Sequence, residues 1–341
     1  MLVDDFWYDL PSAAIAQEAI EPRDSSRLLD TSTMRDLTFG ELPSLLRAGD
    51  LLVVNETKVR AARLVGTRET GGRTEVLLTR RVDRERWQAL IRPAKKVVAG
   101  STITIGPIAV TLLSDPRDGI ATVSLKTSGH TEEAIDEHGI IPLPPYFHGQ
   151  LGNPDRYQTM FATTVGSSAA PTAALHFTPT LMAELEALGV RTARVDLEVG
   201  LDTFRPMDRG AHGTGTIEDH QMHTEHVRVP PETVDAVALA RSGGHRVVAV
   251  GTTVVRSLES AATAGGIIAP FVGSTDLFIT PGYRPQVVDA LITNFHAPST
   301  TLLVLIATLL GPRWRDVYQY ALDSGYRFLS FGDAMYIEVA R

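Results

Sequence analysis

Two stretches of the sequence share one design, in which an apolar strand ends at a polar turn and a helix follows. Residues 247–250 are apolar, and Gly251-Thr-Thr253 separates them from a helical pattern; residues 290–294 and the polar loop after them repeat the arrangement. Such apolar strands, with 51–54 as a third, are typical of a sheet buried on both faces. This predicts an α/β fold, in which ligands bind beyond the carboxyl ends of the strands.

Residues 63–140 have a different texture, with short alternating strands separated by Gly, Asp and Pro turns. This spacing is typical of a small antiparallel barrel or sandwich. The strands expected there are 75–79, 87–91, 102–105, 109–113 and 121–125. The strand–helix alternation returns only after residue 140, so we predict a main α/β domain of residues 1–62 and 141–341 that carries the active site. An antiparallel β-barrel-like domain of residues 63–140 is inserted into it.

A loop of small residues, 166–178, contains one titratable side chain, His176. Small side chains let a ligand approach the backbone closely, and an imidazole exchanges protons near neutral pH. Thr178 then reads as an N-cap with Pro179 in the first helical position. This pattern predicts a binding loop that meets the turns after residues 250 and 294. The alternative is a tight interior turn that holds a hydrogen-bonded core histidine.

Positive charge is concentrated in one segment of an acidic chain. The net charge is −8, but residues 58–96 hold 12 Lys and Arg against 4 Asp and Glu, a local charge of +8. Such a segment can bind phosphates, or it can be a solvated face of a sheet. Arg23 and Arg27 are four apart, so a helix would place both on one face, suited to a phosphate or carboxylate. The alternative is a surface loop with ion pairs.

The composition limits where in the cell the protein is expected and which side-chain chemistry it can use. There is no cysteine, so disulfides and thiolate chemistry are excluded. The longest apolar run, residues 302–310, is too short to span a bilayer, and the acidic N-terminus lacks the features of a signal peptide. We expect a cytoplasmic protein with no membrane partner.

Two polar clusters need an explanation. Residues 218–226 contain three His and three acids, a pattern that could ligate zinc. A hydrogen-bonded cluster at a pocket is favoured, because no cysteine or H-E-x-x-H motif supports a metal. Residues 195–202 read as a strand with Asp196, Glu198 and Asp202 on one face. These carboxylates could serve acid–base chemistry or a cation, or they could form a solvated face.

Motifs along nearly the whole chain resemble those of the S-adenosylmethionine:tRNA ribosyltransferase-isomerases of queuosine biosynthesis. The matching motifs are Glu21-Pro-Arg-Asp-Ser-Ser-Arg-Leu-Leu29, Leu52-Val-Val-Asn55, Arg92-Pro-Ala-Lys95, Leu143-Pro-Pro-Tyr146, Tyr157-Gln-Thr159, Ala169-Ala-Pro-Thr-Ala173, Leu175-His-Phe-Thr178, Asp219-His220 with Met222-His223 and Glu225, Val250-Gly-Thr-Thr-Val-Val-Arg256, Ile292-Thr-Asn-Phe-His296 and Gly332-Asp-Ala-Met335.

The resemblance implies a transferase and isomerase for which S-adenosylmethionine is the co-substrate and supplies its ribose, without a metal. The acceptor implied is 7-aminomethyl-7-deazaguanine in the tRNA wobble position, and the products are epoxyqueuosine-tRNA, adenine and methionine. The fold implied is an α/β domain with an inserted β-barrel-like domain, in agreement with the texture of the sequence.

The chemistry of this family needs a base that removes a proton beside the sulfonium and a donor that helps adenine leave. The resemblance makes His176, His220, His223 and His296 the candidates, and Asp219 or Glu225 would orient an imidazole. We therefore expect four imidazoles to meet in one cavity. The expected S-adenosylmethionine-binding residues are Thr172, Phe177, Gly251, Thr252, Thr253, Arg256 and Asn294. The expected RNA- or acceptor-binding residues are Arg23, Arg27, Lys58, Arg60, Arg92 and Lys95.

Some positions depart from the family pattern. Asp196, Glu198 and Asp202 stand where the family usually has Thr, His and Gly, and Ser299 replaces a cation. Added negative charge disfavours RNA. The alternative function is therefore that of a relative that uses S-adenosylmethionine with a small-molecule acceptor in place of tRNA.

Overall fold

The computed structural model describes residues 1–149, 151–200, 206–210, 213–222, 224–263 and 265–339. The chain divides into two compact units. The first comprises Met1–Lys58, Pro144–Val165 and Ala170–Arg341, and the second comprises Val59–Leu143 and Gly166–Ala169.

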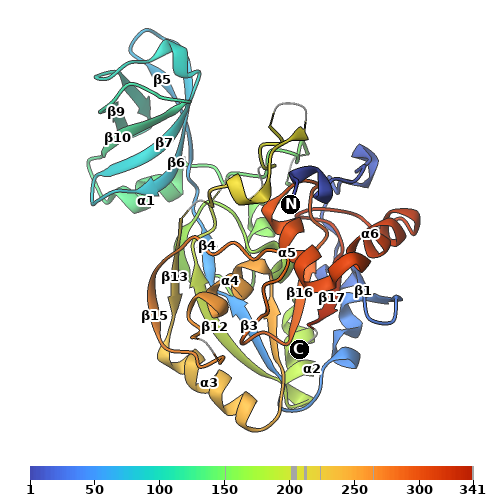
Figure 1. Ribbon diagram of the computed structural model, residues 1–341. Helices are drawn as coiled ribbons and strands as arrows, with labels where there is room; N and C mark the ends of the chain where they lie inside the picture. The colour runs from blue at the N-terminus through green and yellow to red at the C-terminus, as the bar shows by residue number, and fades with distance from the viewer. Residues whose placement is uncertain (150, 201–205, 211–212, 223, 264, 340–341) are drawn as a thin grey trace. The chain divides into compact units, whose positions relative to one another are not determined.

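The first unit is built on a mixed sheet with the strand order β15-β13-β12-β3-β14-β16-β17-β1-β2 (Figure 1). Its strands are β1 (Arg27–Asp30), β2 (Arg35–Thr38), β3 (Leu51–Asn55), β12 (Arg191–Leu197), β13 (Glu225–Val229), β14 (Val247–Val250), β15 (Phe271–Thr275), β16 (Ala290–Asn294) and β17 (Ala334–Glu338). The central strands β12, β3, β14 and β16 run parallel, so their carboxyl ends meet at one edge. Three of these strands, β3, β14 and β16, are formed by the apolar runs at 51–54, 247–250 and 290–294, as predicted.

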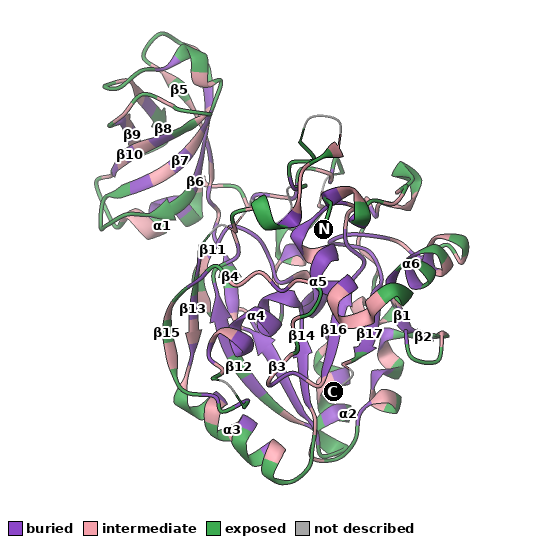
Figure 2. Cartoon of the chain, in the orientation of Figure 1, coloured by how far each residue is buried: buried purple, intermediate pink, exposed green. Residues whose placement is uncertain are grey.

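Both faces of the central strands are covered, as their uniformly apolar sequence requires. On one face, alternate residues such as Leu52, Val54 and Val248 join a core that includes residues of α2 and of the 3₁₀ helix η4 (Phe39–Leu45). Helix α4 packs against β3, β12 and β14. Figure 2 shows the resulting burial of these strands. The α-helices of this unit are α2 (Pro179–Ala187), α3 (Pro231–Ser242), α4 (Thr252–Ser260), α5 (Thr301–Leu310) and α6 (Trp314–Asp323).

Cap chemistry read from the sequence places the helix starts. The Thr178 hydroxyl accepts from the backbone N–H of Leu181, with Pro179 in the first turn of α2, as predicted. Thr300 caps α5 in the same way.

The second unit is a closed antiparallel barrel with the strand order β10-β7-β6-β5-β8-β9. Its elements are β5 (Arg63–Arg68), β6 (Arg73–Arg81), β7 (Arg86–Arg92), β8 (Thr102–Ile105), β9 (Ile108–Leu112), β10 (Ile120–Lys126) and helix α1 (Thr131–His138). The five strands expected from the sequence are present, and β5 is an additional one. The prediction of an α/β fold with an antiparallel β-barrel-like part is confirmed. A further pair, β4 (Thr57–Val59) and β11 (Thr164–Ser167), forms a separate two-stranded sheet.

Segment η4 is a 3₁₀ helix with Pro43 inside it, because proline cannot donate an α-helical hydrogen bond. The last strand, β17, begins at Ala334 after a series of turns. Arg23 and Arg27 do not share a helix face, because Arg23 begins a 3₁₀ turn and Arg27 begins β1. Arg27 instead pairs with Asp36.

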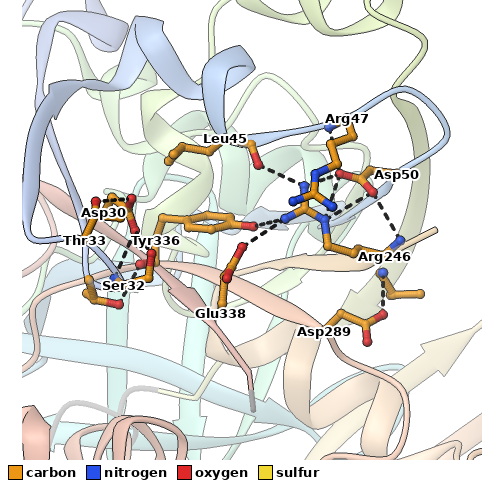
Figure 3. Close-up of polar contacts among 12 residues, drawn as sticks. Asp30, Ser32, Thr33, Leu45, Arg47, Asp50, Arg246, Asp289, Tyr336 and Glu338 are labelled. Atoms are coloured by element: carbon orange, nitrogen blue, oxygen red, sulfur yellow. Dashed lines mark hydrogen bonds and ion pairs between the residues drawn. The ribbon is translucent and has the colours of Figure 1, made fainter. Parts of the chain in front are cut away.

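A buried ion pair ties the amino ends of the central strands together (Figure 3). Arg246, just before β14, donates to Asp50, just before β3, through Nη2 at 2.5 Å and Nε at 3.1 Å. The same guanidinium donates to the Tyr336 hydroxyl and the Leu45 carbonyl oxygen. Burial opposes ionisation of Asp50, but the hydrogen bonds from Arg246 and Arg47 outweigh it and lower the pKa of the carboxyl. This network stabilises the end of the sheet away from the carboxyl edge.

Candidate active site

A pocket lies at the carboxyl edge of the parallel strands, where the strand–turn–helix design predicts a site. It encloses about 600 Å³ of atom-free space, counting its open mouth. The turn after β14, the end of β16 and the loop that precedes His176 all contribute to its wall. The lining residues are Tyr146, Ala170, Pro171, Thr172, Ala173, Val199, Gly251, Thr252, Thr253, Thr293, Asn294, His296, Ala297, Thr300, Leu302, Leu329 and Ser330.

The amino end of helix α4 forms one side of this pocket. Gly251 has φ 93°, in the left-handed region that favours glycine, and it caps the helix without a side-chain hydrogen bond. Backbone N–H groups at a helix start point outward and carry partial positive charge. With the hydroxyls of Thr252 and Thr253, this end of α4 is suited to a carboxylate or another anion.

A chain of hydrogen bonds links the pocket wall to His176. Asn294, at the end of β16, accepts from the Thr172 hydroxyl at 2.8 Å, so its amide nitrogen faces His176 Nε2 at 3.1 Å. Nε2 therefore accepts, and the ring proton lies on Nδ1, 2.7 Å from the Ser26 hydroxyl oxygen. The ring also stacks on Phe39 with centroids 4.8 Å apart. Both ring nitrogens of His176 are thus occupied.

His176 is neutral at physiological pH. Burial, and then the positive charges of Arg156, Arg327 and Arg23, lower its pKa to about 3. The position matches the interior hydrogen-bonded histidine that the sequence left open as an alternative. In this arrangement His176 orients Asn294, which lines the pocket.

His296 is the histidine that lines the pocket in the described part of the chain. Its Nε2 lies 3.0 Å from the Thr293 hydroxyl oxygen, and its backbone groups are held by Tyr8 and Tyr318. Burial lowers the pKa of His296 to about 3, so the imidazole is neutral. A neutral imidazole can accept a hydrogen bond or a proton from a ligand.

The other predicted catalytic residues do not line this pocket. His220 is half-buried with its ring 5.8 Å from that of Phe278, and Asp219 is exposed and accepts from Thr216. Glu225 is buried and paired with Arg256. His223 lies outside the described residues. The structure therefore does not bring four imidazoles into one cavity: His296 lines the pocket, and His176 contacts its wall through Asn294.

The residues predicted to bind S-adenosylmethionine fall into two groups. The pocket is lined by five of them, Thr172, Gly251, Thr252, Thr253 and Asn294. The other two, Arg256 and Phe177, are not among its lining residues. Arg256 is held by Glu225 and by the Leu277 carbonyl oxygen, and Phe177 packs in the core against Phe39 and Phe161.

The residues predicted to bind RNA also divide. Lys58, Arg92 and Lys95 are exposed. The remaining three are held by internal contacts. Arg27 pairs with Asp36 and lies 3.7 Å over the Tyr326 ring, and Arg60 pairs with Glu132. Arg23 donates to backbone carbonyl oxygens, including that of Gln158 at 2.9 Å.

The unusual carboxylates do not enter the pocket wall. Strand β12 ends at Leu197, and of its neighbours Val199 lines the pocket. Neither Asp196, which is buried, nor Glu198, which is exposed, is among the residues that line the pocket. Burial, and then the charge of Glu198, raise the pKa of Asp196. Asp202 lies outside the described residues.

Tyr146 and Ser330 line the pocket although the sequence singled out neither for a role. The two hydroxyls hydrogen-bond each other, and burial raises the pKa of Tyr146 to about 12. Ser26, the partner of His176, was also missed. Tyr146 and Ser26 lie within two of the matching motifs, Leu143-Pro-Pro-Tyr146 and the one that begins at Glu21, and this is the signal that could have found them.

Neither a metal cluster nor a membrane-spanning helix occurs among the described residues. They contain no cluster of three His, Asp or Glu arranged to hold a metal ion. None of the described helices has the length and apolar character needed to cross a bilayer.

Comparison with known proteins agrees with the fold and the motifs. A family model described as "Queuosine biosynthesis protein" matches residues 3–337. Proteins named S-adenosylmethionine:tRNA ribosyltransferase-isomerase from Symbiobacterium thermophilum and Desulfitobacterium hafniense are 47% and 46% identical to this chain, over 99% of it and 100% of their own length. A crystal structure of an S-adenosylmethionine tRNA ribosyltransferase from Thermotoga maritima is similar at 36% identity and a TM-score of 0.54, covering 98% of this chain and 99% of its own. Because these matches span nearly the whole chain, it is an enzyme and belongs to the queuosine biosynthesis protein family.

Proposed function

We propose that this enzyme transfers and isomerises the ribosyl moiety of S-adenosylmethionine onto 7-aminomethyl-7-deazaguanine in the tRNA wobble position. The products are epoxyqueuosine-tRNA, adenine and methionine. The observation that carries the proposal is the pocket at the carboxyl edge of the sheet, which combines the start of α4, Asn294 and a neutral His296. The chain that forms it is similar over its length to proteins named S-adenosylmethionine:tRNA ribosyltransferase-isomerase.

The pocket offers groups for each part of S-adenosylmethionine. The start of α4 with Thr252 and Thr253 would hold the methionine carboxylate. Asn294, already oriented by His176 and Thr172, would hydrogen-bond the nucleoside.

The reaction needs a proton acceptor and a proton donor in this pocket. The sulfonium acidifies the adjacent ribose carbon, and the imidazole of His296, which lines the pocket, would accept the proton released there. The electrons of the glycosidic bond leave with adenine, which then takes up a proton. The amine of the acceptor forms a carbon–nitrogen bond to the ribosyl fragment and loses a proton, and the carbon–sulfur bond breaks with its electron pair leaving on methionine. The hydroxyls of Tyr146 and Ser330 are candidate donors, because both line the pocket. His176 is a positioning residue in this scheme, and the roles predicted for His220, His223, Asp219 and Glu225 remain proposals.

The barrel unit and its flanks would bind the anticodon arm. We take residues 63–140 as the inserted domain in this proposal, with Arg92 and Lys95 as its exposed cations. Lys58 is exposed on the first unit. Phosphate contacts of this kind weaken steeply as salt rises. A cytoplasmic location, where tRNA is found, follows from this role.

Adenine release tests the proposal. The enzyme is incubated with S-adenosylmethionine and with tRNA that carries 7-aminomethyl-7-deazaguanine, with the same tRNA carrying guanine, or with no tRNA. Adenine formed only with the modified tRNA supports the proposal. Adenine formed with a small amine and no tRNA would support the small-molecule alternative. The argument for that alternative from added negative charge is weakened, because Asp196 and Glu198 are not among the residues that line the pocket.

A further inference from the structure

A second cavity beside the pocket is lined by three arginines. Arg23, Arg156 and Arg327 line an atom-free space of about 230 Å³, counting its open mouth, and His176 forms part of the same wall. Ser330 lines both this cavity and the pocket. These arginines come from three distant segments of the first unit, so the fold, and not a local motif, brings the charges together.

The arginines are only partly satisfied by the protein. Arg156 donates to the Glu21 carboxylate and to the Ile20 carbonyl oxygen, but its buried Nη1 has no hydrogen-bond partner among the described residues. Arg327 donates to the Glu18 carbonyl oxygen at 3.0 Å, and its buried Nη2 makes no hydrogen bond to the described residues but faces Asp333 in an ion pair. Buried guanidinium donors are rarely left without acceptors, so Arg156 Nη1 points to an acceptor that comes from a ligand.

Positive charge exceeds negative charge around this cavity. Arg23 donates to carbonyl oxygens, and the carboxylate whose charge acts on it is Glu21, which also pairs with Arg156. Two carboxylates face the group: the exposed Glu21 on Arg156, and the buried Asp333, whose Oδ1 lies 3.5 Å from Arg327 Nη2. Three guanidiniums against two carboxylates leave a net charge of +1 in a half-buried cavity.

We infer that the cavity bounded by Arg23, Arg156 and Arg327 binds a phosphate group of the RNA, beside the pocket that the acceptor nucleotide must reach. Planar guanidiniums with paired N–H donors match the oxygens of a phosphodiester. The cavity adjoins the pocket through Ser330, and the Asn294–His176 hydrogen bond connects the two walls. One phosphate fixed there would set the register of the RNA strand. The inference rests on the proposed function, because it takes RNA as the substrate.

The test measures RNA binding without S-adenosylmethionine, so that it does not depend on catalysis. The probe is an anticodon stem-loop that carries 7-aminomethyl-7-deazaguanine, and its affinity is measured over a series of salt concentrations. The variants are Arg156→Gln and Arg327→Gln, with Arg156→Lys and Arg327→Lys as milder changes. Arg241→Gln is the matched control, since Arg241 is half-buried, donates to the Gly266 carbonyl oxygen and lies outside both cavities.

Each Gln variant is expected to weaken binding about tenfold. It is also expected to reduce the slope of log affinity against log salt by about 0.7–0.9, because one phosphate is no longer neutralised. The Lys variants keep the slope but bind more weakly, because the planar fork is absent. Arg241→Gln changes neither quantity. Unchanged slopes and affinities in both Gln variants, with lowered thermal stability, would overturn the inference and leave a structural role.

Calorimetry with S-adenosylmethionine alone separates the two possible sources of an oxyanion. Unchanged affinity in the Arg156 and Arg327 variants is expected. A loss of that affinity with RNA binding intact would assign the cavity to the methionine carboxylate and overturn the inference. The two proposals can fail separately. If the variants weaken RNA binding as expected but the wild-type enzyme releases no adenine, the proposed function is refuted and the phosphate site remains.

Discussion

The buried histidines make the stability of the first unit depend on pH. An unfolded histidine has a pKa near 6.5, whereas His176 and His296 have pKa values of about 3 in the folded chain. Between these values the unfolded chain binds more protons, so the free energy of unfolding falls as the pH falls. From pH 7 to pH 5 each of the two histidines lowers it by about 2 kcal/mol, or about 4 kcal/mol together.

Urea unfolding at pH 7, 6 and 5 measures this effect. In a Trp87→Phe background the remaining tryptophans, exposed Trp7 and buried Trp314, both belong to the unit that holds the two histidines, so fluorescence reports on that unit. His176→Gln removes one titrating group, so the loss between pH 7 and pH 5 should shrink by about 2 kcal/mol relative to the parent. Any loss of unfolding free energy that His176→Gln causes at pH 7 does not affect the test, because only the change in unfolding free energy between pH 7 and pH 5 is compared. A variant whose stability falls with pH as steeply as the parent's would show that His176 is not neutral in the folded chain.

Three further outcomes are expected. His296→Gln should lower kcat for adenine release by about 10²–10⁴-fold, whereas the same change at the exposed His226 should leave it intact; equal effects would remove His296 from the reaction. Arg246→Met leaves a buried carboxylate unpaired, so it should cost about 3 kcal/mol of unfolding free energy and about 6–12 °C in Tm. The kcat of Arg246→Met at 25 °C should stay close to the parent's, since the Arg246–Asp50 pair lies at the far end of the strands. A Tm that changes by less than about 2 °C would show that water reaches the Asp50 carboxylate. Substituting exposed Arg92 and Lys95 by Gln should reduce the salt slope of tRNA binding by about 0.7–0.9 for each phosphate that is no longer neutralised, and an unchanged slope would place the RNA elsewhere.

Local chemistry made several features predictable. Four consecutive apolar residues at 247–250 can be stable only where both faces of a strand are covered, and they form the centre of the sheet. The Gly251 turn and the Thr178 and Thr300 caps satisfy backbone groups within a few residues, so sequence alone locates the helix starts. The turn-separated strands of the barrel follow from alternation and from Gly and Asp at the turns.

The contacts that define the site depend on residues far apart in the chain. Glu225 had the features of a group that orients an imidazole, but the fold buries it against Arg256, where an unpaired charge would be costly. His176 was predicted as a proton carrier, yet Ser26 and Asn294 occupy both of its nitrogens and its burial removes its charge.

The sequence by itself determined the α/β fold, the inserted barrel and the edge of the sheet at which the pocket opens, because these follow from hydrophobic period and turn chemistry over short distances. Only the tertiary structure decided which histidine lines the pocket, which nitrogen of His176 carries its proton, and that three arginines share one cavity. Those properties depend on burial and on long-range partners, and neither can be read from the spacing of residues along a chain.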